Sequence, residues 1–242
     1  MSNLITKNRL PGILAALLAL ATATLAVSCR QEYRRVEARK TAATITIDGN
    51  PEAAWSNCPY TQIDKMASGE LNVEDSLDFS AAHKLLYDQD NLYLLVKVKD
   101  SRVFSDRQLS TYMNDGIELH FDVANDKVAH FETGRHFKFT FEFNPSLPYA
   151  HERIDGNFTN KKGVQAAFLE NPDGYTSEIK IPWTALNLNN SPGKIMGYNI
   201  NVNDNDSRPA DVLIKERESV LSLTENGEHS WQWTNVYANL QF

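Results

Sequence analysis

Hydrophobic and polar residues alternate with a period of two in several short segments, and this pattern constrains the fold more than any other feature. The clearest case is residues 137–143, where Phe occupies every odd position and Lys, Thr and Glu lie between. Residues 117–122 alternate in the same way, after an Asn114-Asp115-Gly116 turn. Successive side chains of a β-strand point to opposite faces, so each segment predicts a strand with one face in a core.

Similar short segments recur along the chain, and turn-forming residues separate them. The further candidate strands are 43–47, 81–87, 92–98, 175–181, 198–203 and 237–242. Helical periodicity is nearly absent. Many short alternating strands predict an all-β protein with an antiparallel β-sandwich of immunoglobulin-like or jelly-roll-like appearance.

The N-terminal segment has the pattern of an export signal. Two basic residues precede an apolar run from Ile13 to Val27, which is too short and too rich in Ala and Thr for a membrane span. Cys29 follows directly and resembles the cysteine of a bacterial lipobox, although Leu25 lies one position further away than usual. We expect a lipidated Cys29; a plain secretory signal is the alternative.

This reading divides the chain into three parts. We expect a signal peptide over 1–28, a lipidated cysteine and polar tether over 29–42, and one domain over 43–242. The residue after Cys29 is Arg30 and not the aspartate associated with inner-membrane retention. The expected location is therefore the cell envelope, at the outer membrane or cell surface.

Charge excludes one class of partner. The chain has 24 basic and 31 acidic residues, and loss of residues 1–28 leaves 22 basic residues and a net charge of −9. Nucleic-acid binding needs a basic surface, so we expect none. A neutral polyol or bound calcium fits this balance.

Cys29 and Cys58 are the only cysteines, which rules out a disulfide framework, and Cys58 is expected to be a small buried residue.

Three candidate strands carry polar rows of one character opposite their apolar rows. If these strands are neighbours in one sheet, their outer face offers carboxylate, ammonium and amide groups that can bond a vicinal diol. A run of asparagines is unusual in a strand and favours a binding face over a merely solvated one. The rows are Glu118 and His120; Lys138, Thr140 and Glu142; and Asn199, Asn201 and Asn203.

Seven motifs, in order, resemble family 9 carbohydrate-binding modules over almost all of residues 43–242. They are Ile47-Asp48-Gly49 with Trp55, Leu86-Tyr87-Asp88 with Asn91-Leu92-Tyr93, Val98-Lys99-Asp100, Asn114 to Asp122, Gly174 to Trp183, Gly197 to Asp204, and Ser230-Trp231 with Leu240 to Phe242. The resemblance implies an immunoglobulin-like sandwich and non-catalytic capture of oligo- or polysaccharides, often at chain ends. It also implies structural calcium and a partnership with glycoside hydrolases in polysaccharide breakdown.

The resemblance also implies a set of ligand-binding residues. Two aromatic rings hold one sugar between them in the family, and these rings fall on Tyr112 and Trp231. The acidic hydrogen-bonding residue falls on Glu118 and the amide on Asn201. The family's arginine falls on Lys138, which replaces a bidentate fork by a point charge. We expect no catalytic residue and no required cofactor.

Two other functions remain open. Related sandwiches of respiratory enzymes bind haem b, and an electron-transfer domain would need Met113 or Met196 as one axial ligand. A glycoside hydrolase would need two carboxylates on either side of one bond. Asp115 and Glu118 are three apart on one strand and face opposite sides, so they cannot form that pair.

Several other residues have ordinary interpretations. We expect Trp55 and Trp183 in the core and Trp233 outside the clamp. Residues 203–206 predict an Asx-rich turn rather than a calcium loop, because they lack the glycine and late glutamate of an EF-hand. The histidine spacing does not suggest zinc.

Overall fold

The computed structural model describes residues 31–69, 78–106, 109–143, 154–156, 163–206 and 219–242. The expected signal peptide and Cys29 lie outside the described residues. Residues 33–242 form one compact unit. In the described part of the chain, no helix is long and apolar enough to cross a membrane.

Within the described residues, one sheet has eight strands. Its main path runs in the order β1-β14-β12-β7-β8-β9, while β13 pairs with both β12 and β4. The bounds are β1 (Arg35–Glu37), β4 (Lys65–Ser68), β7 (Gly116–Asp122), β8 (His136–Glu142), β9 (Ile154–Gly156), β12 (Ile195–Asp204), β13 (Ser219–Ser222) and β14 (Ala238–Gln241).

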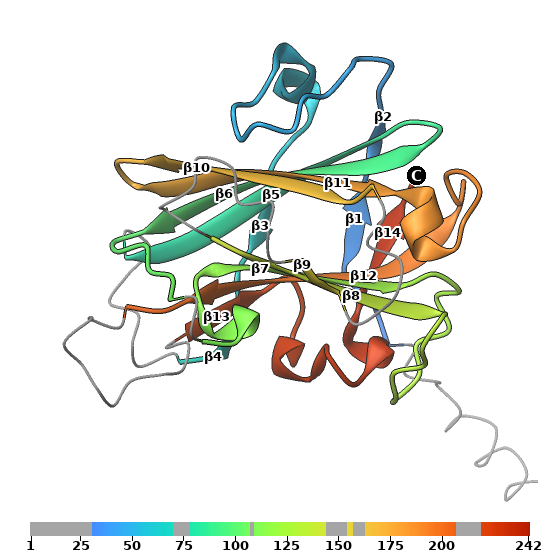
Figure 1. The fold of residues 1–242 in the computed structure, drawn as a ribbon. Coiled ribbons are helices and arrows are strands. Elements are labelled where there is room, and N and C mark those ends of the chain that lie inside the picture. Colours follow the sequence, from blue (N-terminus) through green and yellow to red (C-terminus); the bar gives the residue numbers. More distant parts are fainter. Residues whose placement is uncertain (1–30, 70–77, 107–108, 144–153, 157–162, 207–218) are drawn as a thin grey trace, which may run out of the picture. The chain divides into compact units, whose positions relative to one another are not determined.

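The second sheet has six described strands, in the order β10-β11-β6-β5-β2, with β3 paired to β5. The bounds are β2 (Arg39–Lys40), β3 (Thr61–Ile63), β5 (Phe79–Tyr87), β6 (Asn91–Asp100), β10 (Gln165–Asn171) and β11 (Gly174–Pro182). Figure 1 shows the two sheets as stacked layers. The predicted all-β sandwich is confirmed.

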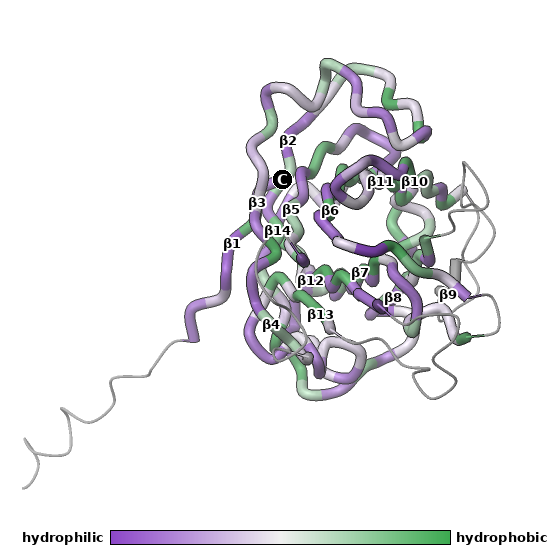
Figure 2. Tube along the Cα trace, turned by 90° about the vertical axis from the view of Figure 1, so that its left-hand side faces the viewer, coloured by the Kyte–Doolittle hydropathy of each residue, from purple (hydrophilic) through white to green (hydrophobic). Residues whose placement is uncertain are grey.

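The apolar rows of both sheets face each other and form one core. Leu119 and Phe139 are 0% and 2% exposed, and Trp183 is fully buried, as predicted for a core residue. Each fully buried large apolar side chain contributes about 1.5–3 kcal/mol. Figure 2 shows hydrophobic positions gathered in the strands, including β7, β12 and β14.

The tether predicted over 29–42 is wrong in its second half. Arg35–Glu37 pairs in parallel with β14, and Arg39–Lys40 pairs in parallel with β5. Val36 and Ala38 are buried, so this segment passes from one sheet to the other along the edge of the core. The folded unit therefore begins at Tyr33 and not at residue 43.

The expected strand over 43–47 is also wrong. Residues 43–58 cross the outer face of the six-stranded sheet and include one 3₁₀ turn, η1 (Ala53–Asn57). Ile45, Trp55 and Cys58 form a small cluster there with residues of β5 and β6. The Trp55 indole donates to Glu178 Oε1 at 3.0 Å, so its polar atom has a partner inside this cluster.

Candidate functional site

The three polar rows lie side by side, as predicted. Strand β7 pairs with β8 on one edge and with β12 on the other. Glu118 lies opposite both Thr140 and Asn201, and the next row contains Lys138, His120 and Asn199. The sheet therefore has one continuous polar face.

Most of this polar face is covered and not open to water. Residues 223–237 pass beneath the sheet and cover most of it, including two 3₁₀ turns, η5 (Gly227–His229) and η6 (Thr234–Val236). These turns follow the eight-stranded sheet on the side away from the core in Figure 1. As a result Asn199, Asn201 and Asn203 are at most 2% exposed.

The covering segment is held by the asparagine row. Asn201 Nδ2 donates to Ser230 Oγ at 3.0 Å, and Thr224 Oγ1 donates to Asn199 Oδ1 at 3.0 Å. Gly227 makes the close approach possible, because a Cβ there would lie 1.9 Å from Ser222 Oγ. The asparagines that suggested a binding face thus also serve as partners for this segment.

One hollow of about 380 Å³ remains at the edge of the covered face, within the size range of small-ligand sites. All five predicted ligand-binding residues line it. They are Tyr112, Glu118, Lys138, Asn201 and Trp231, together with Glu228. Tyr112 and Trp231 are 43% and 53% exposed, which is unusual for large aromatic side chains and leaves ring surface for a ligand.

Three polar side chains contact the Glu118 carboxylate, which is 2% exposed. Lys138 Nζ lies 3.1 Å from Oε2, and Asn203 Nδ2 donates to Oε1 at 3.1 Å. His120 Nε2 lies 3.4 Å from Oε2. These contacts fix the orientation of the carboxylate at the base of the hollow.

His120 is not among the five ligand-binding residues expected from the family resemblance, but it contacts one of them. Its Nε2 also lies 3.4 Å from Ser230 Oγ, so it links Glu118 to the residue before Trp231. Its place in the same polar row as Glu118 was the signal available in the sequence. Glu228 was missed as well, and the alternation that marks strands gives no signal for a residue in a 3₁₀ turn.

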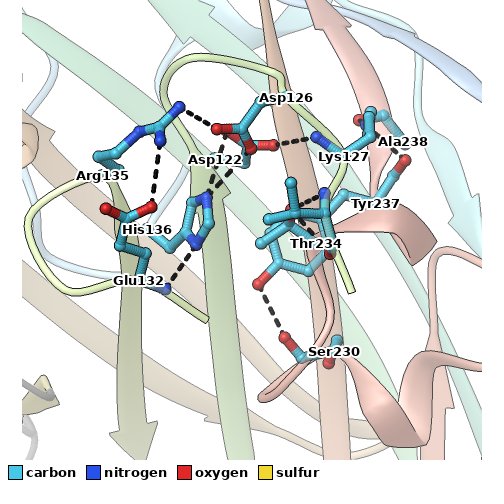
Figure 3. Close-up of polar contacts among 11 residues, drawn as sticks. Asp122, Asp126, Lys127, Glu132, Arg135, His136, Ser230, Thr234, Tyr237 and Ala238 are labelled. Carbon is cyan, nitrogen blue, oxygen red and sulfur yellow. Dashed lines mark hydrogen bonds and ion pairs between the residues drawn. The ribbon is translucent and has the colours of Figure 1, made fainter. Parts of the chain in front are cut away.

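The loop between β7 and β8 holds the Trp231 segment from its other side. Lys127 Nζ donates to the carbonyl oxygens of Tyr237 and Ala238 at 2.6 and 2.8 Å. Val128 N donates to Thr234 Oγ1 at 2.9 Å, and the Tyr237 hydroxyl donates to the Ser230 carbonyl at 2.7 Å. Figure 3 shows this network. Burial lowers the pKa of Lys127 to about 8.

Among the described residues, two clusters of side chains are candidates for the calcium that the family resemblance implies. One is Asp122, Asp126 and His136, with ligand atoms within 4.8 Å of one another. His136 Nδ1 accepts the Glu132 N–H at 2.8 Å, so a neutral ring carries its proton on Nε2, the atom facing Asp126. Arg135 also pairs with Asp126. This group therefore does not fit a metal ion.

The second group does fit. One carboxylate oxygen each from Asp100, Asp115 and Asp204 lies within 4.8 Å of the others, and all three residues are buried. Loss of hydration raises the pKa of Asp100 to about 6 and of Asp204 to about 8, and raises that of Asp115 well above its usual value. Three converging buried carboxylates match the oxygen ligands that calcium prefers.

The remaining candidates take no part in the hollow. Met196 packs inside the hydrophobic core, and the comparisons with known proteins give no support for the haem alternative. The Trp233 ring packs against His229 with centroids 4.2 Å apart and does not line the hollow. Asp115 accepts the Asn205 N–H at 2.6 Å and is buried, so it faces no substrate.

A β-sandwich with two exposed rings above a wall of fixed carboxylate, ammonium and amide groups belongs to the class of non-catalytic sugar-binding modules. The family model described as "Carbohydrate family 9 binding domain-like" matches residues 47–242, and the chain belongs to this family. The predicted family membership and the absence of a catalytic role are confirmed.

Curated relatives and solved structures agree with this assignment. The chain is 28% identical over 197 residues to Exoglucanase XynX of Acetivibrio thermocellus and 27% identical over 197 residues to Endo-1,4-beta-xylanase A of Thermoanaerobacterium saccharolyticum. These matches cover 81% of this chain but only 16% and 15% of those proteins.

A family 9 module of Caldicellulosiruptor kristjanssonii in complex with cellotriose has the same fold. Its TM-score is 0.68 at 20% identity, and the match covers 86% of this chain and 93% of that one. A putative carbohydrate-binding protein of Bacteroides uniformis matches with a TM-score of 0.53 at 12% identity, over 87% of this chain and 100% of that one.

Proposed function

We propose that the hollow between Tyr112 and Trp231 is the saccharide site of this module. The observation that carries the proposal is that two exposed rings and three predicted polar side chains, from distant parts of the sequence, line one hollow. The C–H face of a pyranose packs on an aromatic ring while its hydroxyl groups point sideways. Glu118 and Lys138 then make charge-assisted hydrogen bonds to those hydroxyl groups, and Asn201 adds amide contacts.

The favoured ligands are β-linked glucose or xylose oligosaccharides. One similar structure contains cellotriose, another contains glucose, and three relatives are named xylanases. The module would thereby support polysaccharide breakdown by keeping a glycoside hydrolase, whether in the same assembly or nearby, close to its substrate.

Calorimetry with cellotriose and xylotriose tests the clamp. Trp231→Ala and Tyr112→Ala should each lower the affinity at least tenfold, because truncating a large aromatic contact at a binding site costs about 2 kcal/mol or more. Both variants should keep the wild-type melting temperature, since both rings are exposed. Unchanged affinity in both variants would refute the clamp.

Structural calcium at Asp100, Asp115 and Asp204 is a second part of the proposal. If calcium is bound, these three carboxylates hold it next to the N-terminal end of β7, on the opposite face of that strand from Glu118. The ion would offset the repulsion among three buried negative charges. It would not contact the saccharide.

Export and lipid anchoring form the third part. The support is the apolar run before Cys29 and the lipobox-like residues Leu25 to Cys29. The polar residues from Arg30 would then link an anchor at the outer membrane or cell surface to the domain. Cys29→Ser should move the protein from the membrane fraction to the soluble fraction after export. If wild-type protein is itself soluble, the anchor is wrong and a plain secretory signal explains the segment.

A further inference from the structure

The outer face of the six-stranded sheet changes character halfway along β5 and β6. At one end Leu86, Tyr93 and Leu95 are covered by the cluster that contains Trp55. At the other end the described residues leave the face uncovered. There β6 presents Lys97, which is exposed, and Lys99, which is half-buried, and the cover ends at Tyr60.

A hollow of about 280 Å³ lies on this uncovered end. The pairing of the strands places Gln62, Ala82, Lys97 and Thr176 in one row across four strands. Ser80 and Lys99 form the neighbouring row. The Tyr60 ring, 43% exposed, lines the hollow beside them; Lys84 Nζ lies over one face of this ring, 4.3 Å from its centroid, which leaves the other face for a ligand. An aromatic ring, an amide and an ammonium group are also present in the saccharide hollow of the other sheet.

Lys97 and Lys99 give this hollow its distinct chemistry. Both project from the same face of β6, two residues apart. No carboxylate of the described residues forms an ion pair with either ammonium group. This is unusual in a chain with 31 acidic residues, where a lysine on a solvated face would readily find an acidic neighbour. Two unpaired ammonium groups beside an exposed ring fit a sugar that carries its own carboxylate.

We propose that this hollow is a second binding site, separate from the Tyr112–Trp231 clamp, for saccharides that contain uronic acid. The carboxylate binds between Lys97 and Lys99, the pyranose ring packs against Tyr60, and Gln62 and Thr176 bond its hydroxyl groups. The two sites lie on the outer faces of opposite sheets. One protein could therefore hold a neutral chain and an acidic chain of a mixed glycan together.

The test uses the full-length protein, with trigalacturonate as the acidic probe and cellotriose as the neutral one. Lys97→Gln/Lys99→Gln should lower the affinity for trigalacturonate about tenfold, because each exposed ion pair contributes up to about 1 kcal/mol. The affinity of wild type should also fall as salt is added. Binding of cellotriose should stay unchanged. A matched control is Lys40→Gln/Lys194→Gln, which removes the same charge at exposed positions outside the hollow.

Trp231→Ala separates this proposal from the clamp. It should abolish cellotriose binding and leave trigalacturonate binding intact. Loss of trigalacturonate binding in Trp231→Ala, with retention in the double lysine variant, would overturn the second site, as would no binding by wild type. If the control variant lost the same affinity for trigalacturonate, the effect would come from net charge and the second site would be overturned. Stronger competition by poly-glutamate than by trigalacturonate would assign the surface to an acidic polypeptide and overturn the saccharide assignment.

Discussion

The Glu118 carboxylate has its partners in place before any ligand arrives. Lys138 and Asn203 each contact one of its oxygens at 3.1 Å, and His120 approaches at 3.4 Å. A sugar hydroxyl group therefore meets an acceptor with a fixed direction, which lowers the entropy lost on binding. Lys138 in turn is partly exposed and can donate to a second hydroxyl group.

Glu118→Gln should weaken cellotriose binding about ten- to a hundredfold. Hydrogen bonds to charged groups contribute roughly 1.5–3 kcal/mol, and the substitution keeps the shape while it removes the charge. The matched control is Glu228→Gln in the same hollow, where the side chain is 39% exposed at the rim. Calorimetry should show little change for the control. Equal losses in both variants would contradict a special role for Glu118.

At the scale of elements, the clamp depends on two segments outside the strands. They are the covering segment, residues 223–237, and the β7–β8 loop. Trp231 lies in the segment that covers the polar face, and Lys127 and Val128 of the β7–β8 loop hold that segment in register. The position of the ring is thus set by hydrogen bonds between side chains and backbone of residues more than 100 positions apart in sequence.

Lys127→Met should reduce cellotriose affinity several-fold while the sandwich stays folded. It removes donors to two carbonyl groups, and buried carbonyl groups left without partners destabilise the segment. Arg135→Gln is the control, because it removes only exposed ion pairs of the same loop, which contribute little. Titration calorimetry and circular dichroism measure the two effects. A Lys127→Met variant with wild-type affinity would show that Trp231 is held without this loop.

Sequence alternation predicted the strands that are apolar on one face and polar on the other, and β7 lies at the predicted residues. It missed β1 and β2, since strands of three and two residues are too short to alternate measurably. It placed the asparagine row on an open face, because nothing local reveals that residues 223–237 return to cover it. The five clamp residues came from family resemblance, and periodicity alone identified only the polar rows.

At the scale of the whole molecule, the three buried carboxylates make stability depend on pH and calcium. In the folded protein the pKa of Asp100 is about 6 and that of Asp204 about 8, against about 3.9 in an unfolded chain. Between pH 4 and 8 the folded state therefore binds more protons, so stability should fall as pH rises.

Bound calcium should prevent this decrease in stability at high pH. In a chelator, the melting temperature should decrease from pH 5.5 to pH 8, and excess calcium should restore it at pH 8, where the carboxylates are free to bind the ion. Asp204→Asn should weaken both effects, while Asp126→Asn, in the group that does not fit a metal, should leave the calcium response intact. If only Asp126→Asn abolished the calcium response, the ion would instead bind at Asp122, Asp126 and His136, and the proposed site would be wrong.

The parallel pairing of β1 with β14 has a mechanical consequence. Arg35, Val36 and Glu37 lie opposite Asn239, Leu240 and Gln241, and β14 lies beside β12, which carries Asn201. A pull from the N-terminal side, with a glycan held at Trp231, would run along β1 and load these ladder hydrogen bonds in shear, all at once rather than one by one. The same edge strand would thus resist a force applied between the N-terminal segment and a polymer held at Trp231.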